Sequence, residues 1–197
     1  MKEESKFPLV MGNIALDLVN TELVRRGYRY DLLLSEIDLL EWLKLMWEQD
    51  GIHELLLEEA KEQIHFIFPD LINFRALLRV NFEAIADGKA ISDLFFSLLE
   101  EKIKQAPFIY KLHNNKLLSL PIGSIGEKLI SIIALDVLKL IEANKLQKLK
   151  KCSNPDCVLL FIDETGRRKW CSMKICGNRN KAARFQQKKF ENSEEIR

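Results

Sequence analysis

The 197-residue sequence contains only three histidines and four cysteines. No apolar stretch approaches the roughly 18 residues that a transmembrane helix needs. The opening residues 1–6 lack the apolar segment of a signal peptide. Apolar residues at 47% and charged residues at 30% suit a good-sized core under a water-compatible surface. These features exclude membrane, secreted, collagen-like and wholly disordered classes and predict a cytoplasmic protein.

The formal net charge of +1 conceals a strong asymmetry along the chain. Residues 1–144 carry a net charge of −7, residues 145–190 carry +10, and the last seven residues carry −2. An acidic body joined to a basic segment is typical of a protein that meets a polyanion with one end. A solvated, lysine-rich tail is the alternative that charge alone leaves open.

All four cysteines lie in the basic segment, in the spacing C-x4-C-x13-C-x4-C. The tetrapeptide 153–156 holds Asn and Pro, which favour a tight turn, so the first pair can reach one ion. Four soft thiolates favour a tetrahedral structural Zn²⁺ site. Disulfides are disfavoured in a reducing cytosol, and iron–sulfur sites commonly use closer spacings. The pattern predicts one zinc ion, without which about forty residues would not fold. Its ligands are Cys152, Cys157, Cys171 and Cys176.

The basic segment also predicts a small β-hairpin and a helix. Residues 158–162 are expected to form a strand that returns through residues 167–170 to Cys171, and Asn178 to cap a helix reaching about residue 189. Knuckle, hairpin and helix together make a treble clef. Its basic side chains predict a phosphate-binding surface. The expected nucleic-acid contacts are Arg167, Arg168, Lys169, Arg179, Lys181, Arg184 and Lys188.

The preceding residues 1–147 predict a mostly helical domain. Helical spacing favours helices over about 35–51, 54–67, 69–88, 92–107 and 126–149. The last of these helices is apolar nearly all round and is expected to run directly into Cys152. A β-hairpin is expected around Asn114 and Asn115. The fold class is therefore mainly α with a small β-hairpin (α+β), in which this helical domain precedes a treble-clef zinc finger at 148–190 and a disordered tail at 191–197.

The segment from about residue 148 to 188 resembles the CGNR zinc fingers. The resemblance rests on Cys-Gly-Asn-Arg at 176–179, on Cys-Ser-Asn-Pro-Asp-Cys at 152–157 and on Arg-Arg-Lys-Trp-Cys-Ser-Met at 167–173. It implies that the four cysteines bind zinc in a treble clef. Val158 and the short turn 163–166 depart from the usual pattern of the family.

Residues 12–21 and 25–33 resemble, more loosely, the opening of the ABATE domain. That helical domain usually precedes such fingers in bacterial proteins regarded as stress-responsive transcription regulators. The resemblance implies a pocket for a small ligand near Asp17, Asn20, Arg25 and Arg26. The alternative, which the residues favour, is that Asp17 and Asn20 bond backbone groups and fix the helix junction.

No catalytic constellation is found in the sequence. The three histidines are far apart, no phosphate-binding glycine loop or serine-nucleophile motif occurs, and a four-thiolate zinc has no open coordination position. We therefore expect no enzyme. The expected function is that of a DNA-binding transcription regulator with a ligand-sensing N-terminal domain, acting as a homodimer. The alternative is a zinc finger that binds RNA or another protein.

Overall fold

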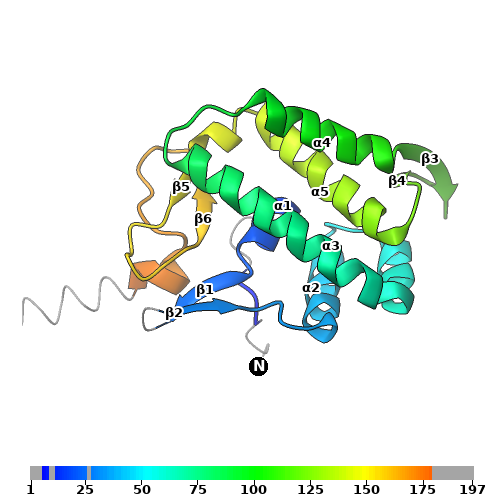
Figure 1. Cartoon of the computed structure of the whole chain (residues 1–197), viewed down its shortest axis with the longest axis horizontal. Helices are drawn as coiled ribbons and strands as arrows, with labels where there is room; N and C mark the ends of the chain where they lie inside the picture. Colours follow the sequence, from blue (N-terminus) through cyan, green and yellow to red (C-terminus); the bar gives the residue numbers. More distant parts are fainter. Residues whose placement is uncertain (1–5, 9–11, 26–27, 179–197) are drawn as a thin grey trace, which may run out of the picture.

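The computed structural model describes residues 6–8, 12–25 and 28–178, and it is mainly helical with small antiparallel hairpins, as the sequence predicts (Figure 1). Its helices are α1 (Ile14–Val19), α2 (Glu36–Glu48), α3 (Glu54–Ala86), α4 (Asp93–Gln105) and α5 (Ile125–Glu142). In the described ranges, strands β1 (Glu22–Arg25) and β2 (Tyr28–Asp31), β3 (Phe108–His113) and β4 (Lys116–Pro121), and β5 (Leu149–Lys151) and β6 (Leu160–Ile162) form three two-stranded sheets. None of the helices in these ranges has the length and apolar content that crossing a membrane requires.

Helices α3, α4 and α5 pack side by side and form the centre of the body (Figure 1). Helix α5 starts at a capping box, in which Ser124 and Glu127 each accept a backbone N–H bond from the other. Its apolar side chains, among them Leu129, Ile133 and Val137, are buried. The predicted hairpin is present as β3–β4, and Asn114 and Asn115 adopt the left-handed conformation of its tight turn.

The long helix α3 differs from the sequence prediction in the position at which its two helical segments meet, which was expected just before Pro69. The helical segment runs from Glu54 to Ala86 with Pro69 inside it, and the break lies at Gln63, where φ is −126° and ψ is 18°. The structure therefore has two helical segments, as the sequence predicts, but they meet at Gln63, and Pro69 lies inside the second segment instead of at its start.

The junction between body and basic segment also differs from the prediction of a helix reaching residue 149. Helix α5 ends at Glu142, and Asn144 takes a left-handed φ of 52°, which stops the helix. The chain then forms a short 3₁₀ turn, η1 (Leu146–Lys148), that leads into strand β5. The expected helix 178–189 and tail 191–197 lie beyond Asn178, outside the described residues.

Strands β5 and β6 share the apolar core of the helices. Leu149, Leu160 and Ile162 are buried in one cluster with the side chains of α1, α3 and α5. A second, smaller cluster holds Phe161 and three of the cysteines. The β5–β6 hairpin thus has one side in the body and the other on the cysteines, at the C-terminal end of α3 (Figure 1).

Candidate metal centre

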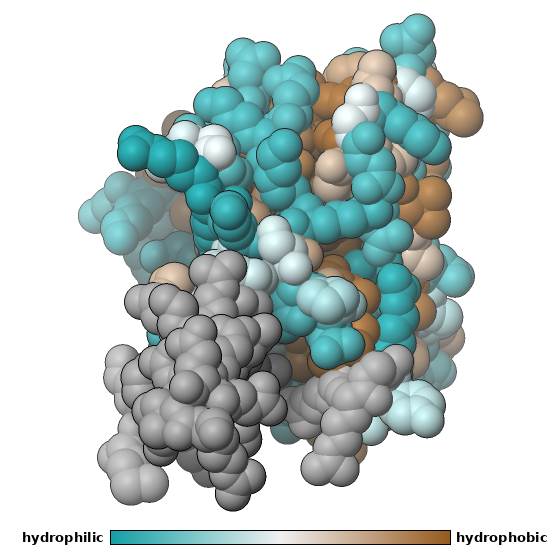
Figure 2. All heavy atoms as spheres, turned by 90° about the vertical axis from the view of Figure 1, so that its left-hand side faces the viewer, coloured by the Kyte–Doolittle hydropathy of each residue, from teal (hydrophilic) through white to brown (hydrophobic). Residues whose placement is uncertain are grey.

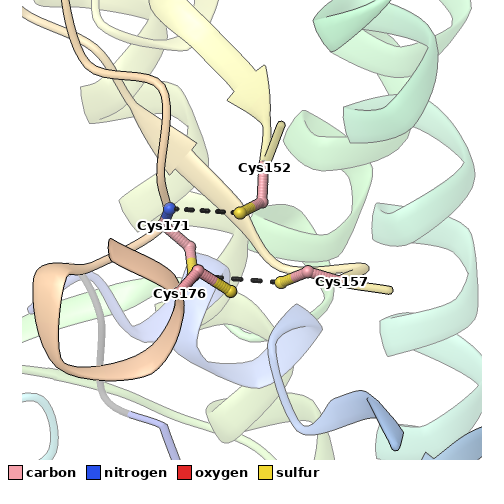
Figure 3. A group of neighbouring side chains, drawn as sticks. All are labelled: Cys152, Cys157, Cys171 and Cys176. Carbon is pink, nitrogen blue, oxygen red and sulfur yellow. Dashed lines mark hydrogen bonds between the residues drawn. The ribbon is translucent and has the colours of Figure 1, made fainter. Parts of the chain in front are cut away.

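The four cysteine side chains converge on one point beside the β5–β6 hairpin (Figure 3). Cys152 follows β5 and Cys157 lies just before β6. Cys171 precedes a helical turn, η2 (Met173–Gly177), and Cys176 lies within it. All four sulfur atoms lie within 4.8 Å of one another, and the Sγ atoms of Cys157 and Cys171 are 3.9 Å apart. Two segments separated along the chain thereby present one four-sulfur cluster.

This arrangement fits a single tetrahedral metal ion. Thiolates at about 2.3 Å from a central zinc would lie about 3.8 Å from one another, close to the 3.9 Å between the sulfur atoms of Cys157 and Cys171. Disulfide bonds would bring pairs of sulfur atoms to about 2.05 Å, whereas all four cysteines are free thiols. Three of the four side chains are buried, and Cys157 is half-buried. The four cysteines are therefore positioned to bind a metal ion, and their four sulfur atoms suffice for a tetrahedral site.

Hydrogen bonding among the thiols shifts their pKa values in opposite directions. The thiols of Cys157 and Cys171 stabilise the thiolate of Cys152 and lower its pKa. The same hydrogen bonds, together with burial, raise the pKa of Cys157 and of Cys171. Because a metal ion binds the deprotonated sulfur, binding must release the protons that these two thiols hold.

Local hydrogen bonds shape the first cysteine pair. The carbonyl and side-chain oxygens of Asn154 accept bonds from the backbone N–H groups of Cys157 at 3.0 Å and of Asp156 at 3.1 Å, which closes the predicted turn. The side-chain amide of Asn154 lies 3.5 Å from Cys176 Sγ, and the N–H of Cys171 lies 3.5 Å from Cys152 Sγ. Such bonds orient the sulfur atoms and disperse their negative charge.

The strand and helix boundaries around the second pair differ from the prediction. Strand β6 pairs with β5, not with residues 167–170, which form no strand. The turn that holds Cys176 begins at Met173, and Ser172 caps it by accepting the N–H of Ile175 at 2.9 Å. Asn178 closes this turn at its C-terminal end, where its N–H donates to the carbonyl of Met173, and the helix that it was expected to begin lies outside the described residues. The apolar residues of β6 pair with β5 because that sheet lies on the body core.

Arg168 has a structural position that its predicted role in nucleic-acid binding did not anticipate. Its guanidinium lies 4.6 Å from the ring centre of Phe161 and donates to the carbonyl oxygens of Trp170 and Cys171. The contacts join β6 to the segment that carries the third cysteine. Arg167 and Lys169, its neighbours in the sequence, are exposed. The four other predicted contacts, Arg179, Lys181, Arg184 and Lys188, lie outside the described residues.

Asn20 connects the body to the cysteine-bearing segment. Its side chain is fully buried, donates to the carbonyl of Leu160 at 3.0 Å and accepts the N–H of the same residue at 2.9 Å. The carboxamide thus pairs with the edge of β6 as a neighbouring strand would. Leu160 lies between the two cysteine pairs in the sequence, so this contact fixes the backbone that spaces them.

Two buried arginines of α3 extend this connection, and the sequence analysis missed both. Arg79 donates to the carbonyls of Val19 and of Val158 and forms ion pairs with Glu22 and Glu83, each at 3.0 Å. One turn earlier, Arg75 forms a two-pronged ion pair with Asp31 and donates to the hydroxyl of Thr21 at 2.8 Å. Two arginines four residues apart within the apolar stripe of a helix are the sequence signal for such a network.

The ion pair with Arg75 decides the ionisation of Asp31. Burial opposes the charged form of this carboxyl, but the hydrogen bonds from Arg75 and from the N–H of Leu33 outweigh it and hold its pKa below the usual value. Asp31 ends β2, so its charged form joins that hairpin to α3.

The structure places the residues predicted to bind a small ligand in different elements. Asp17 is buried in α1, Asn20 is bonded to β6, Arg25 ends β1, and Arg26 lies outside the described residues. A pocket of about 440 Å³ lies elsewhere, between the α2–α3 turn, the β3–β4 hairpin and α5. Asp136 lines it, accepts the N–H of Ala15 and has a pKa raised by burial.

The comparison with protein families agrees with the geometry of the cluster. Residues 148–189 match the CGNR zinc finger family, and this range contains all four cysteines. The matched range spans 42 of the 197 residues, so the likeness covers the finger and not the helical body. A search of curated proteins gives no match to the chain. Residues 148–189 are called the finger below.

Proposed function

We propose that the finger binds one structural Zn²⁺ through its four cysteines and contacts DNA, so that the chain acts as a cytoplasmic transcription regulator. The observation that carries the proposal is the overlap of the four-sulfur cluster with the basic segment in one CGNR-type range. Zinc is the metal that four thiolates in a tetrahedral, closed site favour, and it would supply folding energy without redox chemistry. We do not propose catalysis, because a closed four-sulfur site offers no position for a reacting water.

The charge of the finger supports a polyanionic partner. Zn²⁺ with four thiolates carries a formal charge of −2, so residues 145–190, with +10 from their lysines, arginines and acids, remain strongly positive. Arg167 and Lys169 are exposed close to the cysteines. Hydrophilic side chains predominate over the described part of the face that carries the finger (Figure 2). Arg and Lys on such a surface favour phosphate contacts.

The helical body is proposed to act as the sensor of the regulator. Its opening resembles the ABATE domain, and the buried contacts of Asn20 and Arg79 connect the body to the finger. A ligand that prefers one packing of the body would therefore bias the position of the finger. One finger buries only about 600–1,000 Å² on DNA, which supports action as a homodimer on two half-sites.

The proposal is tested by measuring the affinity of the zinc-loaded chain for labelled duplex DNA between about 50 and 300 mM salt. Fluorescence anisotropy of the labelled DNA reports the binding. Each neutralised phosphate should contribute about −0.9 to the slope of log affinity against log salt concentration. Replacing Lys181, Arg184 and Lys188 by alanine should flatten the slope by about 2.7 if each contacts a phosphate.

The matched control removes the same charge from the body, through alanine at the exposed Lys89, Lys111 and Lys116. This control should leave the slope almost unchanged. An affinity that does not vary with salt, or equal losses in the two triple variants, would contradict a DNA contact by the finger. Binding to RNA alone, or to a protein partner with no response to the three finger substitutions, would favour the alternative functions.

A further inference from the structure

An open groove of about 500 Å³ lies on the finger next to the metal centre. Its volume is in the range typical of small-molecule sites, about 300–1,000 Å³. The groove is formed by the segment that carries Cys171 into the centre and by the start of η2. Its lining residues are Arg167, Arg168, Lys169, Trp170, Ser172 and Met173.

The groove combines an aromatic surface with positive charge. Trp170 is half-buried against the cysteine cluster and also lines the groove, and Met173 is 49% exposed. Arg167 and Lys169 are exposed at the same groove. Arg168 is held in place by Phe161 and by two carbonyls, so its position is fixed before any ligand arrives. A ligand that joins a planar ring to an anionic group complements this aromatic surface and its positive charge.

The two acidic residues that precede the groove segment in the sequence already have partners. The carboxylate of Glu164 pairs with Lys145 at 3.0 Å, and that of Asp163 accepts bonds from Thr165. None of the residues that line the groove is acidic. The electrostatic complement of this surface is therefore a phosphate, because the lining residues include Arg167 and Lys169 and no carboxylate.

We propose that the groove binds one unpaired nucleotide of a DNA strand, with the base on Trp170 and Met173 and the flanking phosphates on Arg167 and Lys169. The proposal rests on the DNA-binding function proposed above and specifies the form of DNA that this part of the finger selects. Bases of an intact duplex are stacked on one another, so only an unpaired base offers its face to the indole. Stacking of a base on an aromatic side chain contributes about 1–3 kcal/mol and tolerates any sequence.

The test compares two labelled single-stranded oligonucleotides of equal length and charge, one of thymidines and one of abasic sites, with the zinc-loaded full-length chain. The thymidine strand should bind more tightly than the abasic strand. Trp170→Leu should weaken thymidine binding about 5- to 150-fold and leave abasic binding nearly unchanged. Trp170→Phe, which keeps an aromatic ring, should retain most of the preference.

The matched controls separate stacking from charge. Arg167→Ala and Lys169→Ala should weaken both strands by similar factors, because the phosphates are common to them. Zinc content of each variant, measured by elemental analysis, shows whether Trp170→Leu disturbs the neighbouring centre. Quenching of tryptophan fluorescence gives a second readout on the unaltered chain: the thymidine strand should quench it, the abasic strand should not, and Trp170→Phe should abolish the difference.

Four outcomes would overturn the inference. Equal affinity of the unaltered chain for the two strands would show that the base is not bound. Equal losses for both strands in Trp170→Leu, or quenching that survives in Trp170→Phe, would place the base elsewhere. DNA binding that follows the predicted salt dependence in these cases would leave the proposed function intact, whereas no binding to any DNA would refute both.

Discussion

Replacing Asn20 by alanine tests whether the body holds the finger in place. The substitution leaves the N–H and the carbonyl of Leu160 without their partner in a fully buried position. Each unsatisfied buried group costs about 1–3 kcal/mol, and with partial relaxation of the backbone we expect a total loss of about 2–4 kcal/mol. For a chain of this size such a loss corresponds to a drop of about 4–16 °C in Tm. Thermal unfolding of the zinc-loaded chain, followed by circular dichroism, measures it.

The matched control is Asn81→Ala. The Asn81 side chain is half-buried and donates at 2.9 Å to the carbonyl of Leu77, in its own helix, so its removal leaves no buried group of the finger unpaired. We expect a loss below about 1 kcal/mol for this variant. Because Leu160 lies between the cysteine pairs, Asn20→Ala should also release zinc faster to a competing chelator. Equal Tm values for the two variants, with equal rates of zinc release, would refute the role assigned to Asn20.

Three further predictions concern the arginine contacts and the metal ligands. Arg168→Ala should speed zinc release to a chelator, because it removes the contacts with Phe161 and two carbonyls, whereas the neighbouring variant Arg167→Ala should not; equal rates would contradict this. Asp31→Asn should lower Tm at pH 7, and because the pKa of Asp31 lies below the usual value for an aspartate, the difference from the unaltered chain should shrink as the pH falls below about 4. Acidification should release zinc, since protons compete for the thiolates; a chromogenic chelator that detects the same zinc at pH 5 as at pH 7.5 would exclude this ligand set.

The sequence predicted those parts of the structure that depend on local patterns. The convergence of the cysteines follows from two equal spacings, each with a turn or a helical start between the sulfurs. The β3–β4 turn follows from Asn114 and Asn115, which tolerate left-handed backbone, and the burial of α5 follows from apolar residues that lie nearly all round the helix. In these cases a few neighbouring residues are enough to fix the geometry.

The parts that the sequence did not predict depend on contacts between distant residues. Strand β6 pairs with β5, not with residues 167–170, because β5 and β6 share the core of the helices. The contact of Asn20 with Leu160 spans 140 positions, and no local pattern marks it. The sequence predicts Arg168 as a surface charge, because the contact of its guanidinium with the ring of Phe161 depends on how the two segments pack. The β1–β2 hairpin, which presents Glu22 and Asp31 to α3, was likewise not predicted.

These long-range contacts change the relation between finger and body. A zinc finger on a flexible tether would move independently, whereas here β5 and β6 lie in the core and the carboxamide of Asn20 pairs with the strand edge. The first cysteine pair is therefore positioned largely by the body. The second pair depends on the centre itself and on the contacts of Arg168. Loss of the metal should therefore detach residues 167–178 from the hairpin, while β5 and β6 stay packed in the core of the body.

X-ray absorption at the zinc edge of the purified full-length chain, combined with elemental analysis, tests the four-sulfur zinc centre most directly. We expect one zinc per chain with four sulfur neighbours at about 2.3 Å and no nitrogen or oxygen in the first coordination sphere. A purified chain that contains no zinc, or a zinc ion with nitrogen or oxygen ligands, would contradict the assignment of Cys152, Cys157, Cys171 and Cys176 as its ligands.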